Sequence, residues 1–205
     1  MTRMFMAVLI AAGVTAWAGP ASAATGQTSH YKLYGASAIA LWQHGNTITF
    51  MDAESDNQFG TDVFYDKFTP KFDAHGNFTG GVDVSGDSSR GSVTVGKRLG
   101  SAQVTATIRV RSCIVKASGN TGSCSAPTRI TIDLAFTGYG RTAHGGSNDR
   151  FHYPGVTITD HQVGAQRLAT VTGTIGGQTM LPRYLQDGEI ANLKGGGLFL
   201  CHGCV

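Results

Sequence analysis

The sequence predicts an all-β protein, built as one antiparallel β-sandwich or barrel-like domain and stapled by disulfide bonds. Residues 103–115 and 128–138 alternate apolar and polar side chains, which is typical of strands with one buried and one solvated face. Glycine-rich joins separate several short candidate strands, and this spacing favours a sandwich or barrel. Four cysteines follow an export-type leader, and exported chains form disulfides in an oxidising compartment.

The two alternating segments are expected to pair as a hairpin. In both segments the even-numbered positions are mostly apolar or small, from Val104 in the first and from Ile130 in the second. The turn-rich stretch KASGNTGSCSAP joins them. Because a shift of one residue would turn every apolar side chain to the wrong face, even positions must lie opposite even positions.

Further strands are expected along the rest of the chain. They are residues 36–43, 47–52, 77–85, 92–95, 156–162, 167–175 and 197–201. Pro70 interrupts residues 65–74, so that segment is either an edge strand or a loop. No segment has a convincing helical pattern, and residues 185–193 are the only place where a short helix could form. No repeat or linker divides the chain.

The N-terminus has the pattern of a signal peptide. Arg3 precedes an uncharged, largely apolar run of 16 residues, and Pro20 and an Ala-Ser-Ala site follow it. An uncleaved membrane anchor fits less well, because the run spans about 24 Å and a hydrocarbon core is about 30 Å thick. We therefore expect a signal peptide at 1–23, one β-rich domain at 24–205, and a secreted protein, either extracellular or periplasmic.

Charge and hydropathy narrow the classes of partner. Cleavage would remove one of the 16 basic residues, leaving 15 against 13 acidic residues. This near balance provides no electrostatic footprint for nucleic acid. No second long apolar segment follows, so no membrane span is expected after signal cleavage.

The four cysteines, Cys113, Cys124, Cys201 and Cys204, are expected to form disulfides. Four cysteines allow three pairings, and Cys113–Cys124 is favoured because both lie just beyond the paired part of the hairpin. The terminal CHGC places its histidine inside the pair, unlike a haem attachment motif. A thioredoxin-type redox site needs its first cysteine at the start of a helix, which lowers the thiol pKa, and CHGC lacks that setting. A structural zinc site needs four ligands, and the two cysteines of CHGC supply only half of them.

The stretch at 141–161 is the first candidate for a contact region, as a glycine-rich loop on a β-scaffold. Its candidate ligand-binding residues are His144, Asp149, Arg150, His152, Tyr153 and His161. Asp160 joins them in an enzyme hypothesis, in which a histidine and an aspartate act in acid–base catalysis. The histidine spacing matches no metal motif, and a solvated loop remains the plainer alternative.

The acidic stretch at 52–62 resembles a calcium loop only in composition. Aligned as an EF-hand, it has Asn57 where glycine is required and Val63 where glutamate is required. An acidic hairpin loop is therefore expected, with a loosely calcium-stabilised loop as the alternative.

Residues 96–177 resemble an uncharacterised family of exported bacterial all-β proteins. The resemblance lies in GKRLGSAQVTATIRV, RITIDLAFTGYG, GGSNDRFHYPGVTITD and RLATVTGTIGG. It implies a signal peptide and a compact β-domain, and it assigns no functional residue.

These observations favour a secreted, non-catalytic binding module without a cofactor, whose unknown ligand is a carbohydrate or another surface component. A secreted hydrolase or isomerase that uses the histidines and aspartates of 141–161 is the alternative from another class. A metal-binding protein that uses histidines and the terminal thiols is the third.

Overall fold

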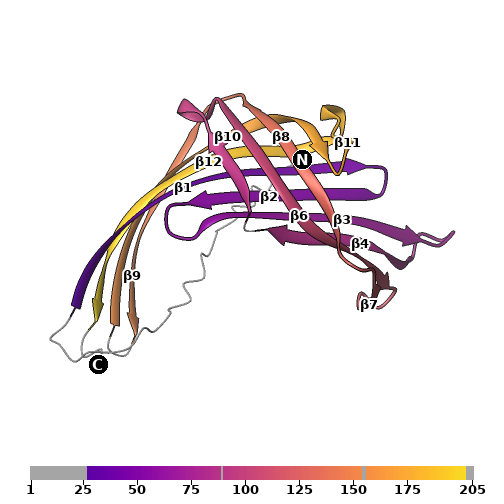
Figure 1. Cartoon of the computed structure of the whole chain (residues 1–205), viewed down its shortest axis with the longest axis horizontal. Helices are drawn as coiled ribbons and strands as arrows, with labels where there is room; N and C mark the ends of the chain where they lie inside the picture. Colours follow the sequence, from indigo (N-terminus) through magenta and orange to yellow (C-terminus); the bar gives the residue numbers. More distant parts are fainter. Residues whose placement is uncertain (1–26, 89, 154–155, 202–205) are drawn as a thin grey trace.

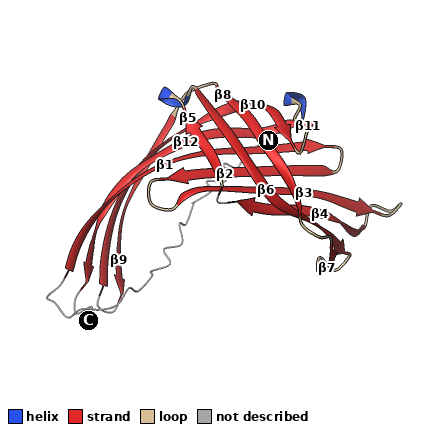
Figure 2. Cartoon of the chain, viewed as in Figure 1, coloured by secondary structure: helices blue, strands red, loops and turns tan. Residues whose placement is uncertain are grey.

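The computed structural model describes residues 27–88, 90–153 and 156–201, and they are almost entirely β-strand (Figures 1 and 2). The strands are β1 (Gln27–His44), β2 (Thr47–Asp56), β3 (Gly60–Phe72), β4 (Phe78–Ser88), β5 (Gly91–Val95), β6 (Ser101–Lys116), β7 (Thr121–Cys124), β8 (Thr128–Gly138), β9 (Ala143–Tyr153), β10 (Val156–Ile175), β11 (Gln178–Thr179) and β12 (Leu185–Cys201). Two 3-10 helices, η1 (Lys97–Leu99) and η2 (Pro182–Tyr184), complete these ranges. The expected signal peptide at 1–23 lies outside the described residues.

The sheet closes on itself, so the expected barrel-like antiparallel architecture is confirmed. The ring runs β1-β2-β3-β4-β6-β8-β10-β12 and returns to β1, and every pairing in it is antiparallel. The hairpin of β6 and β8 has the expected register, with Val104 opposite Leu134 and Ala106 opposite Ile132.

The interior of the ring is filled by side chains rather than open. On β6, each even-numbered residue from 102 to 110 is buried and each odd-numbered residue is exposed. The largest fully buried side chains include Phe136, Met51, Leu99 and Ile108. At about 25 cal/mol per Å² of apolar surface removed from water, this core is the main source of stability.

One glycine is required where the ring closes. Gly173 of β10 lies opposite Leu134 of β8 and has a φ of 130°. A Cβ atom there would lie 2.1 Å from the carbonyl oxygen of Asp133. Glycine therefore lets β10 approach β8 closely enough to complete the ring.

The loop between β6 and β8 is stapled as expected. β7 pairs with the end of β6, and a disulfide bond joins Cys113 to Cys124. Cys201 ends β12, but its side chain and the whole of Cys204 lie outside the described part of the chain.

Beyond the ring, β9 and the outer parts of β10, β12 and β1 form a curved sheet, seen at the lower left of Figure 1. We call this sheet the extension. It consists of β9 with residues 156–165 of β10, residues 192–201 of β12 and residues 27–35 of β1, in that order across the sheet. The open edge of β1 is partly covered, because Asn57 and Gln58 donate their side-chain amides to the carbonyl oxygen of Lys32.

The structure decides three expectations about local structure, at residues 141–161, at residues 185–193 and at Pro70. The stretch at 141–161 is not a loop, since most of it forms β9 and the start of β10, which pair over eleven positions. Residues 185–193 form no helix but lie in β12, whose partners β1 and β10 override the local preference. Pro70 is accommodated in β3 because the pairing with β2 ends at Phe68. Pro70 therefore interrupts no ladder on that side.

The acidic stretch at 52–62 is a hairpin, as expected, formed by β2, β3 and the turn between them. Within the described ranges, no helix has the length and apolarity needed to cross a membrane.

Candidate functional site

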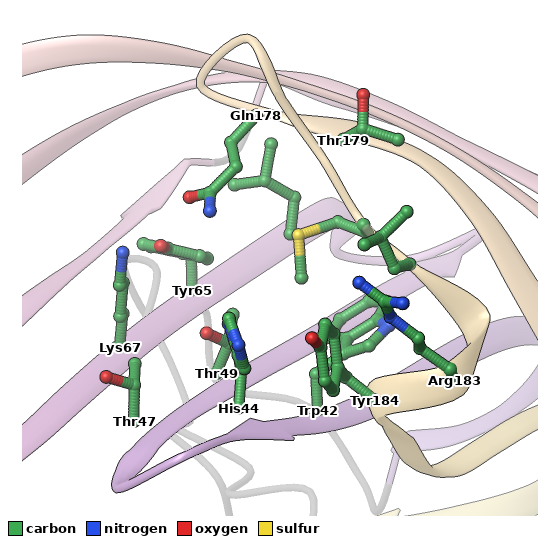
Figure 3. Close-up of a pocket in the computed structure, with 13 residues that line it drawn as sticks. Trp42, His44, Thr47, Thr49, Tyr65, Lys67, Gln178, Thr179, Arg183 and Tyr184 are labelled. Carbon is green, nitrogen blue, oxygen red and sulfur yellow. The ribbon is translucent and has the colours of Figure 1, made fainter.

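A pocket of about 220 Å³ lies at one end of the ring, where β1 turns into β2 (Figure 3). The wall from β1, β2 and β3 meets the segment that links β10 to β12. The lining residues are Trp42, His44, Thr47, Thr49, Tyr65, Lys67, Ile175, Gln178, Thr179, Met180, Leu181, Arg183 and Tyr184.

The segment that covers the pocket is built from turn-forming residues. Gly176 and Gly177, both with positive φ, make the tight turn from β10 into β11. Pro182 then starts η2, a position where its fixed φ and missing N–H carry no penalty. These local signals bring Arg183 and Tyr184 back over the end of the ring (Figure 3).

The charge of the lining has one sign. Lys67 comes from β3 and Arg183 from η2, and no lining residue is an aspartate or glutamate. His44 adds an imidazole ring to the lining. With low-polarity protein around it, such a lining attracts an anion.

Trp42 carries a buried hydrogen-bond donor without a partner in the described part of the chain. Its side chain is only 2% exposed, and its indole Nε1 is buried with no acceptor among the described residues. An unsatisfied buried donor costs about 1–3 kcal/mol. Because Trp42 lines the pocket, a ligand with an acceptor oxygen could recover that cost.

Aromatic contacts hold the cover in place. The rings of His44 and Tyr184 are stacked with centroids 4.0 Å apart. The guanidinium carbon of Arg183 lies 4.8 Å from the centroid of the same tyrosine ring, a cation–π contact.

Tyr65, on the opposite wall, is buried, and this burial raises its pKa to about 12, with a smaller effect from Asp66. Its hydroxyl therefore remains protonated at neutral pH and is able to donate.

The lining combines flat apolar surfaces with cations and neutral hydrogen-bond donors. This combination matches a small organic anion.

The residues expected at 141–161 are divided between the two faces of the extension. Their register places His144, Arg150, His152 and His161 on the face that continues the interior of the ring. Asp149 projects from the other face, and so does Asp160, its partner across the strands. The convergence of histidines with aspartates that the enzyme hypothesis requires is therefore not provided by the sheet. Tyr153 ends β9, and its side chain lies outside the described part.

Two of the histidines make hydrogen bonds with neutral partners. His161 Nδ1 lies 2.5 Å from Asn148 Oδ1, and His152 Nδ1 lies 3.1 Å from Thr157 Oγ1. Among the described residues, no group of three histidine, cysteine or carboxylate side chains could hold a metal ion.

The pocket was not predicted from the sequence. Its residues come from positions 42–67 and 175–184, and no motif connects these segments. The local signals were the glycine pair at 176–177, Pro182 and a tryptophan in an alternating strand, and none of them identifies a site alone.

Comparison with known proteins identifies no family or relative of this chain. No family model, no curated protein and no solved structure matches this chain.

Proposed function

We propose that this chain is a secreted, non-catalytic binding protein, and that the pocket at the end of the ring binds a small organic anion. The ligand class is a carboxylate, or a similar anionic group, attached to a flat apolar body. The observation that carries the proposal is the buried, unpartnered Nε1 of Trp42 in a lining that has two cations and no carboxylate.

Each part of the ligand has a partner in the pocket. Lys67 and Arg183 complement the anionic group, and a hydrogen bond between charged groups is worth about 1.5–3 kcal/mol. Tyr65, Tyr184 and Met180 offer flat or adaptable apolar surface to the body of the ligand. The pocket volume of about 220 Å³ limits the ligand to a small molecule.

A pair of dyes tests the charge preference directly. Anilinonaphthalene sulfonate is a flat apolar anion, and phenylnaphthylamine is its neutral counterpart without the sulfonate. A chain starting at residue 24 contains Trp42 as its one tryptophan, because the other is Trp17. Quenching of Trp42 fluorescence therefore reports binding at this pocket.

The proposal predicts that the anionic dye quenches Trp42 at lower concentration than the neutral dye. The double variant Lys67→Met with Arg183→Met should weaken binding of the anionic dye by about tenfold or more, equivalent to about 1.4 kcal/mol. Binding of the neutral dye should change little. The matched control is Lys71→Met with Arg129→Met, which removes two exposed cations elsewhere. Equal quenching by both dyes, or equal losses in both double variants, would refute the proposal.

A further inference from the structure

The inner face of the extension, which continues the interior of the ring, carries a concentration of basic side chains. The pairing is regular from Gly35 to the tip, so the alternation of faces is unbroken there. Ala38 of β1, Ile190 of β12 and Ala169 of β10 point into the core, and residues an even number of positions away share their face. We call the resulting surface the cationic face; its residues are His30, Lys32, His144, Arg150, His152, His161 and Lys194.

These side chains are close neighbours across the strands. Gly196 lies between Lys32 and His161 in one row of the sheet, so the centre of that row has no side chain. In the next row, Lys194 lies between Tyr34 and Val163. The three cations Lys32, Arg150 and Lys194 therefore lie around Gly196, where the sheet has no side chain.

The cationic face is open and contains an apolar centre. Every member of the face is exposed, and Tyr34 and Val163 between them are 48% and 44% exposed. Asp149 and Asp160 project from the opposite side of the sheet. No described side chain of this face is a carboxylate.

One part of the outer face of the ring has the opposite charge, while Arg109, Arg111 and Arg129 project outward from the neighbouring strands β6 and β8. On β12, β2, β3 and β4, most of the carboxylates of the chain point outward, and β1, which has no carboxylate, lies between β12 and β2. We call this region the acidic face; its residues are Asp52, Glu54, Asp62, Asp66, Asp83, Asp87, Asp187 and Glu189.

Apolar side chains lie among these carboxylates. Phe64 lies between Asp52 and Asp87 across the strands and is 40% exposed. Ile48, on the same outer face, is 42% exposed. Phe64 and Ile48 therefore add exposed apolar surface to the acidic face.

We infer that the cationic face of one copy docks on the acidic face of a second copy of this chain. The two faces are opposite in charge, and both are strips of antiparallel sheet four or five strands wide. Opposite potentials steer such a contact and fix its orientation. The contact joins two different patches, so it is head-to-tail, and repetition yields rings or filaments.

Salt dependence gives the first test. Sedimentation of the chain starting at residue 24, at about 100 μM and low salt, should show species larger than the monomer. About 0.5 M salt should dissociate them, because the screening length at this concentration is shorter than the distance between neighbouring strands. A monomer under both conditions would overturn the inference.

Charge reversal gives the second, sharper test. Variant one carries Lys32→Glu, Arg150→Glu and Lys194→Glu, which reverse the cationic face. Variant two carries Asp62→Lys, Asp87→Lys and Asp187→Lys, which reverse exposed members of the acidic face. Each variant alone should be monomeric, and an equimolar mixture should assemble again, because each retains the face that the other has altered.

The matched control reverses Lys71, Lys116 and Arg129 to glutamate, three exposed cations outside both faces. It should assemble like the unaltered chain. Circular dichroism and the Trp42 emission maximum show that each variant is folded. Failure of two folded variants to assemble when mixed would overturn the inference. Docking between copies is equally excluded if the unaltered chain stays monomeric while binding vesicles that contain phosphatidylglycerol, since the cationic face would then serve an anionic membrane.

Discussion

The imidazole of His44 and the phenol ring of Tyr184 stack at an interplanar angle of 22°. The first residue ends β1, and the second ends the short helix η2. This contact joins the wall of the pocket to its cover, although the two residues are 184 − 44 = 140 positions apart in the sequence. Such a ring pair contributes about 0.5–1.5 kcal/mol beyond its buried area.

Tyr184→Ala should therefore open the pocket while leaving the ring intact. We expect weaker binding of anilinonaphthalene sulfonate by about tenfold and a small decrease in melting temperature. Fluorescence titration and thermal unfolding measure the two effects. Tyr139→Ala removes a half-exposed tyrosine away from the pocket and is the control. Unchanged dye affinity in Tyr184→Ala would show that the cover does not contribute to binding.

Replacing Cys113 and Cys124 together by serine should destabilise the fold by about 3 kcal/mol, from the entropy of a loop of this size. The two residues are 11 positions apart in sequence. Urea unfolding of the double variant measures the loss. Reduction of the disulfide in the unaltered chain should give the same loss. A stability that is insensitive to both changes would contradict the stapling role.

Asp52 should make the protein less stable at neutral pH than in mild acid. Burial, followed by repulsion from Glu54 and Asp62, raises its pKa from 3.8 to about 6. The folded state therefore holds this proton more tightly than the unfolded state, and its contribution to stability is lost as the pH rises through about 6.

Asp52→Asn removes that loss and should stabilise the protein at pH 7 by about 1–2 kcal/mol. The full pKa shift corresponds to about 3 kcal/mol, reduced here because the carboxyl is partly solvated. The gain should vanish below about pH 4, where the aspartate is protonated in both states. Chemical unfolding at several pH values provides the measurement, with Asp133→Asn, on the exposed face of β8, as control. A gain that is independent of pH would exclude this cause.

Gly173→Ala should disrupt closure of the ring. The added Cβ would lie 2.1 Å from a backbone oxygen, and the φ of 130° is unfavourable for any other residue. We expect a loss of several kcal/mol or failure to fold. Gly145→Ala is the control, because a Cβ there meets nothing within 4 Å. Equal thermal stability of the two variants would show that β10 and β8 can adjust.

The part of the fold predicted from sequence is the part where hydrophobic alternation is long. Residues 103–115 and 128–138 permit one register with both apolar faces buried, and the structure has that register. β9 was missed because HGGSND has no apolar alternation. It is a strand because β10 supplies a backbone partner along its length. Of β12, only residues 197–201 were expected as a strand, and the rest is held in the sheet between β1 and β10.

The candidate site was less predictable than the fold because it depends on closure. Lys67 and Arg183 are remote in sequence, and only the completed ring brings both to one pocket. The separation of basic and acidic side chains onto two faces was also not visible in the sequence. The chain is nearly neutral in total, and the two charged faces emerge only when the alternation of each strand is combined with its neighbours' register.

Three strands, β1, β10 and β12, run without interruption from the ring into the extension. No hinge or linker separates the two parts, so a pull on the tip would be transmitted along covalent backbone directly into the core. Removing residues from the tip would likewise shorten three strands that also form part of the ring. Under mechanical load the molecule should therefore deform as one body. The hydrogen bonds between strands should break before the extension moves independently of the ring.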